Sequence, residues 1–160
     1  MMDLHCDKNG TKRWHLNGVL HRTDGPAIEF SNGSKEWYLN GERHREDDPA
    51  VEDADGTRKW YQNGVLHRTD GPAVIETDGS KFWHQNDQLH REDGPAIERP
   101  SGFKSWWLNG KRHREDGPAV EYANGIKEWW LNGELISKGA RPDNWGELIL
   151  LARVEQVMNS

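Results

Sequence analysis

The chain has 160 residues, of which 27 are acidic and 21 basic, so its formal net charge at pH 7 is −6. A non-specific nucleic-acid-binding protein needs a basic excess to neutralise phosphates, so this balance disfavours that class. The single cysteine, Cys6, excludes an internal disulfide. The first residues lack the features of a secretory signal, and no apolar stretch approaches the roughly 20 residues that span a bilayer. We therefore expect a cytoplasmic protein and no membrane role.

A 23-residue repeat dominates the chain. Tryptophan recurs at this step six times without insertion or deletion, with Gly four residues before it and Asn three residues after it. The tryptophans are Trp14, Trp37, Trp60, Trp83, Trp106 and Trp129. A hydrophobic fraction of 33% is low and by itself favours disorder. Tryptophans at fixed spacing, however, indicate that their large rings are buried in a folded array. The Trp column is therefore interpreted as structural, and as a stacked principal core.

The sequence of each repeat predicts two short strands and two tight turns, illustrated here for residues 27–41 in chain order. The segment 27–30 is a strand, 31–33 a turn, and 35–39 a second strand that contains the Trp. Asn40-Gly41 is a typical hairpin dipeptide, because a type I′ turn needs positive φ at both central residues. Residues 1–9 resemble the drifted tail of a preceding repeat.

Alternation along the strands predicts which columns are neighbours. The Lys or Arg two residues before each Trp shares the face of the Trp, and the aromatic or His after it lies on the other face. A Glu column (Glu29, Glu52, Glu98 and Glu121, with Ile75 in the middle repeat) is expected to pair with the Lys column across strands.

Five repeats contain the sequence His-Arg-x-Asp. Its members are His21, His44, His67, His90 and His113, then Arg22, Arg45, Arg68, Arg91 and Arg114, then Asp24, Asp47, Asp70, Asp93 and Asp116. We interpret it as a structural clasp of the loop between hairpins, in which Arg and Asp hold the loop ends and the Asp carboxylate accepts backbone N–H groups. The His is expected to stack on a neighbouring Trp or to donate to a loop carbonyl.

The alternative interpretation is a ligand site. Regularly spaced guanidinium groups of these five arginines, flanked by Tyr38, Tyr61 and Trp107, could hold a nucleotide or another phosphorylated ligand. The accompanying Asp residues neutralise the row, which disfavours this alternative.

Metal binding and catalysis are not expected. Equivalent positions in a sheet of two-stranded repeats recur roughly every 9–10 Å, so His residues of neighbouring repeats cannot share a zinc ion. Five identical His-Arg-x-Asp sets on an open sheet have no evident nucleophile and no walls that exclude water. We predict no catalytic residue, no metal and no cofactor.

Two repeats depart from the pattern. Asp48 replaces the Gly of Asp-Gly-Pro, and Asp87 replaces the Gly of Asn-Gly. Both are expected to be tolerated because Asp accepts positive φ at small cost.

The composition changes after Arg141-Pro142. Asn144 and Glu147 occupy the N-cap and N3 positions of a capping box, and an apolar run follows, so a helix is predicted over about 144–158. The predicted organisation is a repeat array over 1–137 and a helical cap over 138–160. The alternative role of the helix is to form a homo-oligomer or to dock a partner; a sheet edge is a second candidate for self-association.

The order W-x-x-N-G-x-x-H, with a downstream D-G turn, resembles the MORN (membrane occupation and recognition nexus) repeat over about residues 4–136. It is most similar to the divergent MORN-type repeats of bacterial, phage and giant-virus proteins, although common MORN repeats have Gly where this chain has Arg after His. The resemblance implies an elongated antiparallel sheet of hairpins and a scaffolding role, or lipid association in some members, and it does not imply catalysis. We expect a mainly β, non-enzymatic protein-binding module of a bacterium or phage that sequesters or inhibits a host defence factor.

Overall fold

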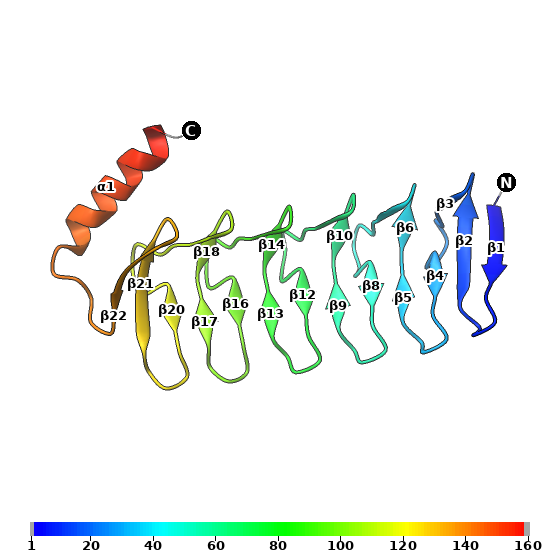
Figure 1. The fold of residues 1–160 in the computed structure, drawn as a ribbon, viewed down its shortest axis with the longest axis horizontal. Helices are drawn as coiled ribbons and strands as arrows, with labels where there is room; N and C mark the ends of the chain where they lie inside the picture. Colours follow the sequence, from blue (N-terminus) through cyan, green and yellow to red (C-terminus); the bar gives the residue numbers. More distant parts are fainter. Residues whose placement is uncertain (1, 159–160) are drawn as a thin grey trace. The chain divides into compact units, whose positions relative to one another are not determined.

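The computed structural model describes residues 2–158 and divides after Asp87 into two compact parts. We call them the N-terminal part and the C-terminal part, and each is described by itself. Both consist of short antiparallel strands joined by tight turns, and the C-terminal part ends in a helix (Figure 1). The predicted mainly β fold of antiparallel hairpins with a C-terminal helix is confirmed.

In the N-terminal part, strands that follow one another along the chain pair into one antiparallel sheet, in the order β1-β2-β4-β5-β8-β9-β12-β13, with β3 beside β2. The pairs β6-β7 and β10-β11 form separate small hairpins. The strands are β1 (Met2–Cys6), β2 (Lys12–Leu16), β3 (Val19–Leu20), β4 (Ile28–Glu29), β5 (Lys35–Glu36), β6 (Tyr38–Leu39), β7 (Glu42–Arg43), β8 (Val51–Glu52), β9 (Arg58–Lys59), β10 (Tyr61–Gln62), β11 (Val65–Leu66), β12 (Val74–Ile75), β13 (Lys81–Phe82) and β14 (His84–Gln85).

The C-terminal part continues the pattern with the sheet order β16-β17-β20-β21-β22 and the small hairpin β18-β19. Its elements are β15 (Gln88–Leu89), β16 (Ile97–Glu98), β17 (Lys104–Ser105), β18 (Trp107–Leu108), β19 (Lys111–Arg112), β20 (Val120–Glu121), β21 (Lys127–Leu131), β22 (Glu134–Lys138) and α1 (Trp145–Met158). Within residues 2–158, no helix combines the length and the apolar character that crossing a membrane requires.

The Asn-Gly turns have the predicted backbone geometry. Asn40 has φ 52° and Gly41 has φ 88°, and the corresponding residues of the other repeats also have positive φ. This is the combination that a type I′ hairpin turn requires. The preceding strand, however, is not continuous over 35–39 as predicted, because it is interrupted at Trp37. The Trp37 N–H donates to Ala50 while its carbonyl accepts from His44, so its backbone connects the main sheet to the small hairpin.

The predicted pairing of the Glu and Lys columns is confirmed by the strand register. Lys35 of β5 lies opposite Glu29 on one side and opposite Glu52 on the other. A direct ion pair is formed between Lys12 and Glu29, with 3.4 Å between the ammonium nitrogen and the carboxylate oxygen. Opposite charges on cross-strand neighbours stabilise this register.

The most deeply buried column is not the tryptophan column but the alanine of Pro-Ala. These alanines are 0% exposed in all five repeats: Ala27, Ala50, Ala73, Ala96 and Ala119. The carbonyl of Ala27 accepts the Trp14 N–H at 2.9 Å, and Trp37, Trp60 and Trp106 form the same bond with the Ala of their repeats. The expected stacked Trp core is wrong in this respect, because Trp14 and Trp37 are half-buried and an arginine, rather than the next indole, covers each ring.

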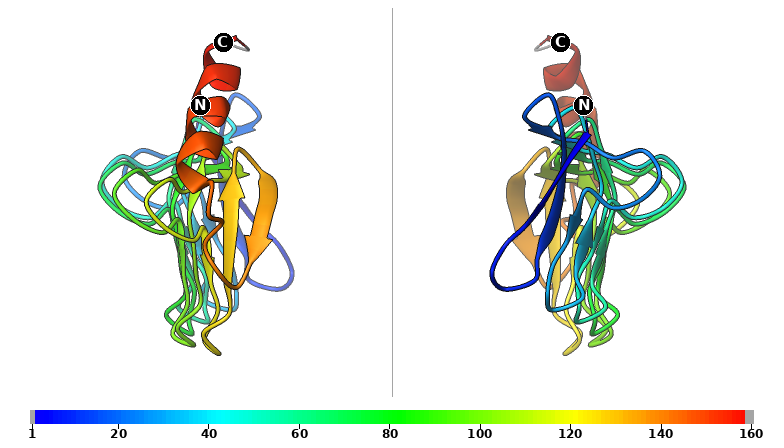
Figure 2. Two further views of the ribbon diagram at one scale, coloured as in Figure 1. Left: turned by 90° about the vertical axis from the view of Figure 1, so that its left-hand side faces the viewer. Right: turned by 90° about the vertical axis from the view of Figure 1, so that its right-hand side faces the viewer.

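Helix α1 begins and ends close to the predicted bounds. The backbone carbonyl of Asn144 accepts the N–H groups of Glu147 and Leu148 at 3.1 and 3.2 Å, which are the first hydrogen bonds of the helix. The side-chain bonds of the predicted capping box are absent between Asn144 and Glu147 in the described chain, so that detail of the prediction is wrong. Trp145, 1% exposed, packs edge-on against Trp129 with ring centres 5.1 Å apart. Leu131 and Ala152 complete this cluster, so α1 is held beside β21 (Figure 2).

Candidate functional site

The arginine of His-Arg-x-Asp is held by contacts within its own repeat. The Arg22 guanidinium carbon lies 4.1 Å from the centre of the Trp14 ring, Nε donates to Asp24 at 2.9 Å, and a terminal nitrogen donates to the Pro26 carbonyl at 3.2 Å. The same terminal nitrogen is 3.4 Å from Glu29. We call this set of contacts the arginine clasp. Arg68 and Arg114 form the same contacts with the Trp, Asp and Pro of their repeats.

In four repeats the Asp of the clasp accepts from the arginine side chain, whereas backbone donors were expected. In the second repeat Asp48 takes the place of Asp47 as the acceptor. The hydrogen bond from the arginine, reinforced by its charge, lowers the pKa of the carboxyl groups of Asp24, Asp70, Asp93 and Asp116. These carboxylates are therefore ionised over the whole physiological range. The arginine charge is matched inside the repeat, which leaves little of it for an external anion.

The second repeat shows how the clasp adapts to Asp48. A Cβ at the equivalent Gly25 would lie 2.9 Å from the Arg22 guanidinium carbon, too close for both to keep their places. In the second repeat Arg45 binds Asp48 at 2.9 Å, and the guanidinium still lies 4.1 Å above Trp37. The expectation that Asp48 is tolerated for its positive φ is wrong, because this position does not have positive φ; at Asp87, with φ 64°, it is correct.

The histidines join neighbouring repeats. Nδ1 of His21 accepts the backbone N–H of Asn40 at 3.0 Å, and each later histidine accepts from the Asn 19 residues ahead. The pairs are His44–Asn63, His67–Asn86, His90–Asn109 and His113–Asn132, at 3.1 to 3.3 Å. Nδ1 of His21 also lies 3.0 Å from the side-chain oxygen of Asn40. The histidine is thus bonded to the Asn of the next repeat, which corrects the expected stacking on Trp or donation to a loop carbonyl.

The two components of the alternative ligand site lie on different sides of the strand. Trp37 and Tyr38 are successive residues and point to opposite faces, and Arg45 covers Trp37. Tyr38 is instead contacted by Arg43, whose guanidinium carbon lies 5.7 Å from the Tyr38 ring centre and 5.5 Å from that of Tyr61. The structure does not bring the clasp arginines together with Tyr38 and Tyr61.

A second arginine–aromatic arrangement in the C-terminal part includes Trp107. The Arg112 guanidinium lies between the rings of Trp107 and Trp130, 5.1 and 4.9 Å from their centres. Sequence analysis missed Arg43 and Arg112 because the column that contains them is Leu in the other repeats. The polar groups of the two rings that contact Arg112 are bonded within the chain: the Trp107 indole N–H donates to Ser105 and the Trp130 indole N–H donates to Glu128.

In the N-terminal part, Glu36 binds both Tyr38 and the Arg43 that lies beside it. The Tyr38 hydroxyl donates to Glu36 at 2.7 Å, and the Arg43 guanidinium donates to both Glu36 oxygens at 3.2 and 3.3 Å. Burial first, and then the hydrogen bond to the Glu36 carboxylate, raise the pKa of Tyr38 to about 12. The Tyr38 phenol is therefore neutral, and its hydroxyl hydrogen is already donated to Glu36. Its role is to pack within the repeat.

Titratable side chains do not cluster as a metal site requires. Across residues 2–158 the structure contains no group of three His, Cys, Asp or Glu side chains arranged to hold a metal ion. The C-terminal part contains a groove of about 740 Å³ beside α1.

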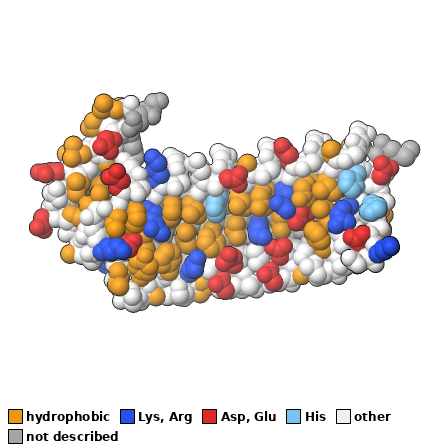
Figure 3. Space-filling model, in the orientation of Figure 1, with side chains coloured by type: hydrophobic (Ala, Val, Ile, Leu, Met, Phe, Trp, Pro, Cys, Tyr) orange, Lys and Arg blue, Asp and Glu red, His pale blue; other side chains and the backbone are white. Residues whose placement is uncertain are grey.

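The outer face of α1 is apolar and exposed (Figure 3). Its residues follow the spacing i, i+1, i+4, i+7 and i+8, which places them on one side of a helix. They are 56 to 80% exposed: Leu150, Leu151, Val154, Val157 and Met158. We call this set the α1 stripe. The opposite side of α1 carries Trp145 and Ala152, which face the core, so this helix is apolar on two sides.

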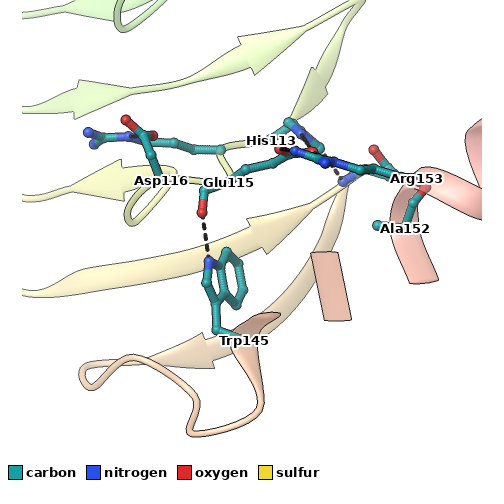
Figure 4. A network of polar contacts seen from close by, with 8 residues as sticks. His113, Glu115, Asp116, Trp145, Ala152 and Arg153 are labelled. Atoms are coloured by element: carbon teal, nitrogen blue, oxygen red, sulfur yellow. Dashed lines mark hydrogen bonds and ion pairs between the residues drawn. The ribbon is translucent and has the colours of Figure 1, made fainter. Parts of the chain in front are cut away.

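Polar contacts fix α1 to the repeat (Figure 4). The Trp145 indole N–H donates to the Glu115 carbonyl at 2.8 Å. The Arg153 guanidinium pairs with the Glu115 carboxylate through two nitrogens, and this hydrogen bond lowers the pKa of Glu115. The Asn132 amide donates to the Ala152 carbonyl at 3.1 Å. The helix is therefore held in a defined position, and the α1 stripe is presented on a fixed support.

No protein-family model matches the chain, and no curated protein matches it at a significant level. The resemblance to the MORN repeat stays a prediction based on the repeat sequence.

Proposed function

We propose that the chain is a non-enzymatic protein-binding module whose partner contacts the α1 stripe. The single observation that carries this proposal is the exposure of five large apolar side chains on one face of a well-anchored helix. Burying such a side chain contributes about 1.5–3 kcal/mol, so contiguous exposure of five favours an interface. A helix needed only to cover the core would have polar residues on this face.

The geometry of the arginine clasp supports a protein partner over a phosphorylated ligand. Arg22, Arg68 and Arg114 each bind a Trp ring, an Asp and a Pro carbonyl of their own repeat. These contacts occupy one face and two nitrogens of each guanidinium, and the Asp carboxylate matches its charge, which weakens its attraction for a phosphate. The exposed apolar surface is open to a partner as it stands.

The test immobilises the chain and captures partner proteins from a cell lysate. The proteins captured by the wild type are compared with those captured by Val154→Glu. Val154 is exposed, so the substitution places a charge in the α1 stripe without disturbing the core. We expect the proteins captured by the wild type to be lost, with the thermal midpoint unchanged. Ile126→Glu, at a residue 50% exposed outside α1, is the matched control and should keep them. Equal capture by Val154→Glu and wild type would contradict the proposal, and stabilisation by a nucleotide would favour the ligand alternative.

A further inference from the structure

The groove beside α1 extends the α1 stripe into a two-walled site. One wall is formed by Leu148, Leu151, Ala152 and Glu155, which are spaced i, i+3, i+4 and i+7 along the helix. The other wall comes from the turns and strands of the two neighbouring hairpins: Leu108, Asn109, Lys111, His113, Leu131, Asn132, Glu134 and Ile136. Leu151 belongs to both the stripe and the groove, so the two form one continuous apolar surface.

The walls favour a helix over an extended strand as the occupant. An added strand needs free backbone donors and acceptors along a sheet edge. Here the turns that line the groove are already bonded: the Gly110 N–H donates to Leu89 at 3.0 Å, and the Gly133 N–H donates to Arg112 at 2.9 Å. The edge strand β22 contributes two side chains to the lining, Glu134 and Ile136, beside a wall that is otherwise helix and turns. An amphipathic helix needs only apolar side chains spaced over two turns, which the wall from Leu148 to Glu155 provides.

The charges around this surface are mostly negative. Glu134 and Glu155 line the groove together with one Lys, Lys111, and Glu147 lies in the first turn of α1. Among residues 2–158 the structure gives none of these four an ion pair, whereas the charge of Arg153 is matched by Glu115. A partner with basic residues beside its apolar anchors would complement this rim. A second copy of α1 would bring further Glu147 and Glu155 carboxylates, so the charges disfavour self-association.

From these observations we infer that the groove and the α1 stripe bind an amphipathic helix of a partner protein, with apolar anchors spaced i, i+3, i+4 and i+7 and with basic flanks. This inference rests on the proposed protein-binding function and specifies its partner.

The probes are three fluorescent peptides of about 18 residues, long enough to form the required two turns. The first has Leu at the anchor positions and Lys on the flanks, the second has Glu in place of Lys, and the third has the composition of the first in scrambled order. Fluorescence anisotropy with the full chain should show the Lys peptide binding at least about tenfold more tightly than the Glu peptide, a difference that shrinks with added salt. The scrambled peptide should not bind.

Variants separate the charge from the apolar surface. Glu134→Lys combined with Glu155→Lys changes two exposed residues and should reverse the preference towards the Glu peptide. Val154→Glu should weaken both peptides, while Ile126→Glu should leave both unchanged. Circular dichroism of each variant checks that the fold is kept.

The outcomes distinguish the two proposals. If both peptides bind equally and Val154→Glu weakens both, the protein-binding surface stands and the basic partner is wrong. If Val154→Glu changes neither, the surface itself is wrong. Absence of Lys-peptide binding overturns the inference, as does a dimer of the chain in sedimentation that Val154→Glu dissociates.

Discussion

The guanidinium carbon of Arg68 lies 4.1 Å from the centre of the Trp60 ring, inside the same repeat. Arg68 also donates to Asp70 at 2.8 Å and to the Pro72 carbonyl at 3.3 Å. One side chain therefore covers the indole and closes the loop between two hairpins. Because the array has few large apolar residues, this cover replaces much of the packing that a second layer would supply.

Replacing Arg68 should destabilise the fold. Cation–π contacts contribute about 0.5–2 kcal/mol and hydrogen bonds to charged groups about 1.5–3 kcal/mol, so Arg68→Ala should lower the free energy of unfolding by about 2–4 kcal/mol. Arg68→Lys keeps the charge but loses the planar face, and should recover only part of this loss. Urea unfolding measures both. Lys81→Ala, at an exposed residue, is the control and should change stability by less than about 0.5 kcal/mol.

The glycine of Asp-Gly-Pro is expected to be restricted by space rather than by φ. A Cβ at Gly117 would lie 2.8 Å from the Arg114 guanidinium carbon, so Gly117→Ala should shift the guanidinium away from Asp116 while it stays over Trp106, as Arg45 stays over Trp37, at a cost of about 1–3 kcal/mol. The matched variant is Asp48→Ala, where the backbone already carries a Cβ. It loses one exposed ion pair and should cost at most about 1 kcal/mol. Equal losses in thermal unfolding would contradict the spatial explanation.

Stability should fall on the acid side because of His84. Burial lowers the pKa of His84 below 6.5, and its Nδ1 is buried without a partner among the described residues. As the pH falls through the ordinary histidine value, the unfolded chain takes up the proton first, so His84 lowers stability in that window. His84→Tyr places there the residue found at positions 38 and 61 and should reduce the loss between about pH 8 and pH 5.5. An identical loss in both proteins, measured by urea unfolding, would show that His84 is not responsible.

The contact between Trp145 and Glu115 should determine whether α1 stays docked. Trp145→Phe keeps a ring against Trp129 but leaves the Glu115 carbonyl without its donor, at a cost of about 1–3 kcal/mol. Trp145→Ala removes a fully buried ring, at a cost of about 3–5 kcal/mol, and should release the helix locally. Limited trypsin cleavage after Arg153, which lies inside α1 and pairs with Glu115 only when the helix is docked, reports this release. Leu150→Ala, on the outer face, should be cleaved no faster than wild type.

Much of the fold could be predicted because it follows from short sequence signals. Asn40-Gly41 specifies a turn type, and alternation around Trp37 predicts which columns share a face. The pairing of Lys35 with Glu29 and Glu52 follows from the same alternation. The break at Trp37 could not be predicted, since it depends on the bond to Ala50 in the next loop.

The site was less predictable, because its contacts depend on side-chain direction and on residues of other repeats. A clasp of the loop by Arg22 and Asp24 was expected, but their direct ion pair and the position of Arg22 over Trp14 depend on how the intervening loop folds back. The role of His21 depends on Asn40, which a motif confined to one repeat does not contain. Arg43 was not predicted as a site residue because most repeats have Leu at its position.

The bond from Asn40 to His21 spans only 19 residues, and the clasp from Arg22 to Pro26 spans four. Each such contact closes a short loop, for which the entropy cost is small. Chains built from local contacts fold fast, and an array of similar repeats can begin to fold at any member and extend to its neighbours. A nascent chain emerging from the ribosome can therefore form each repeat as soon as the next turn has been synthesised, with no distant segment required.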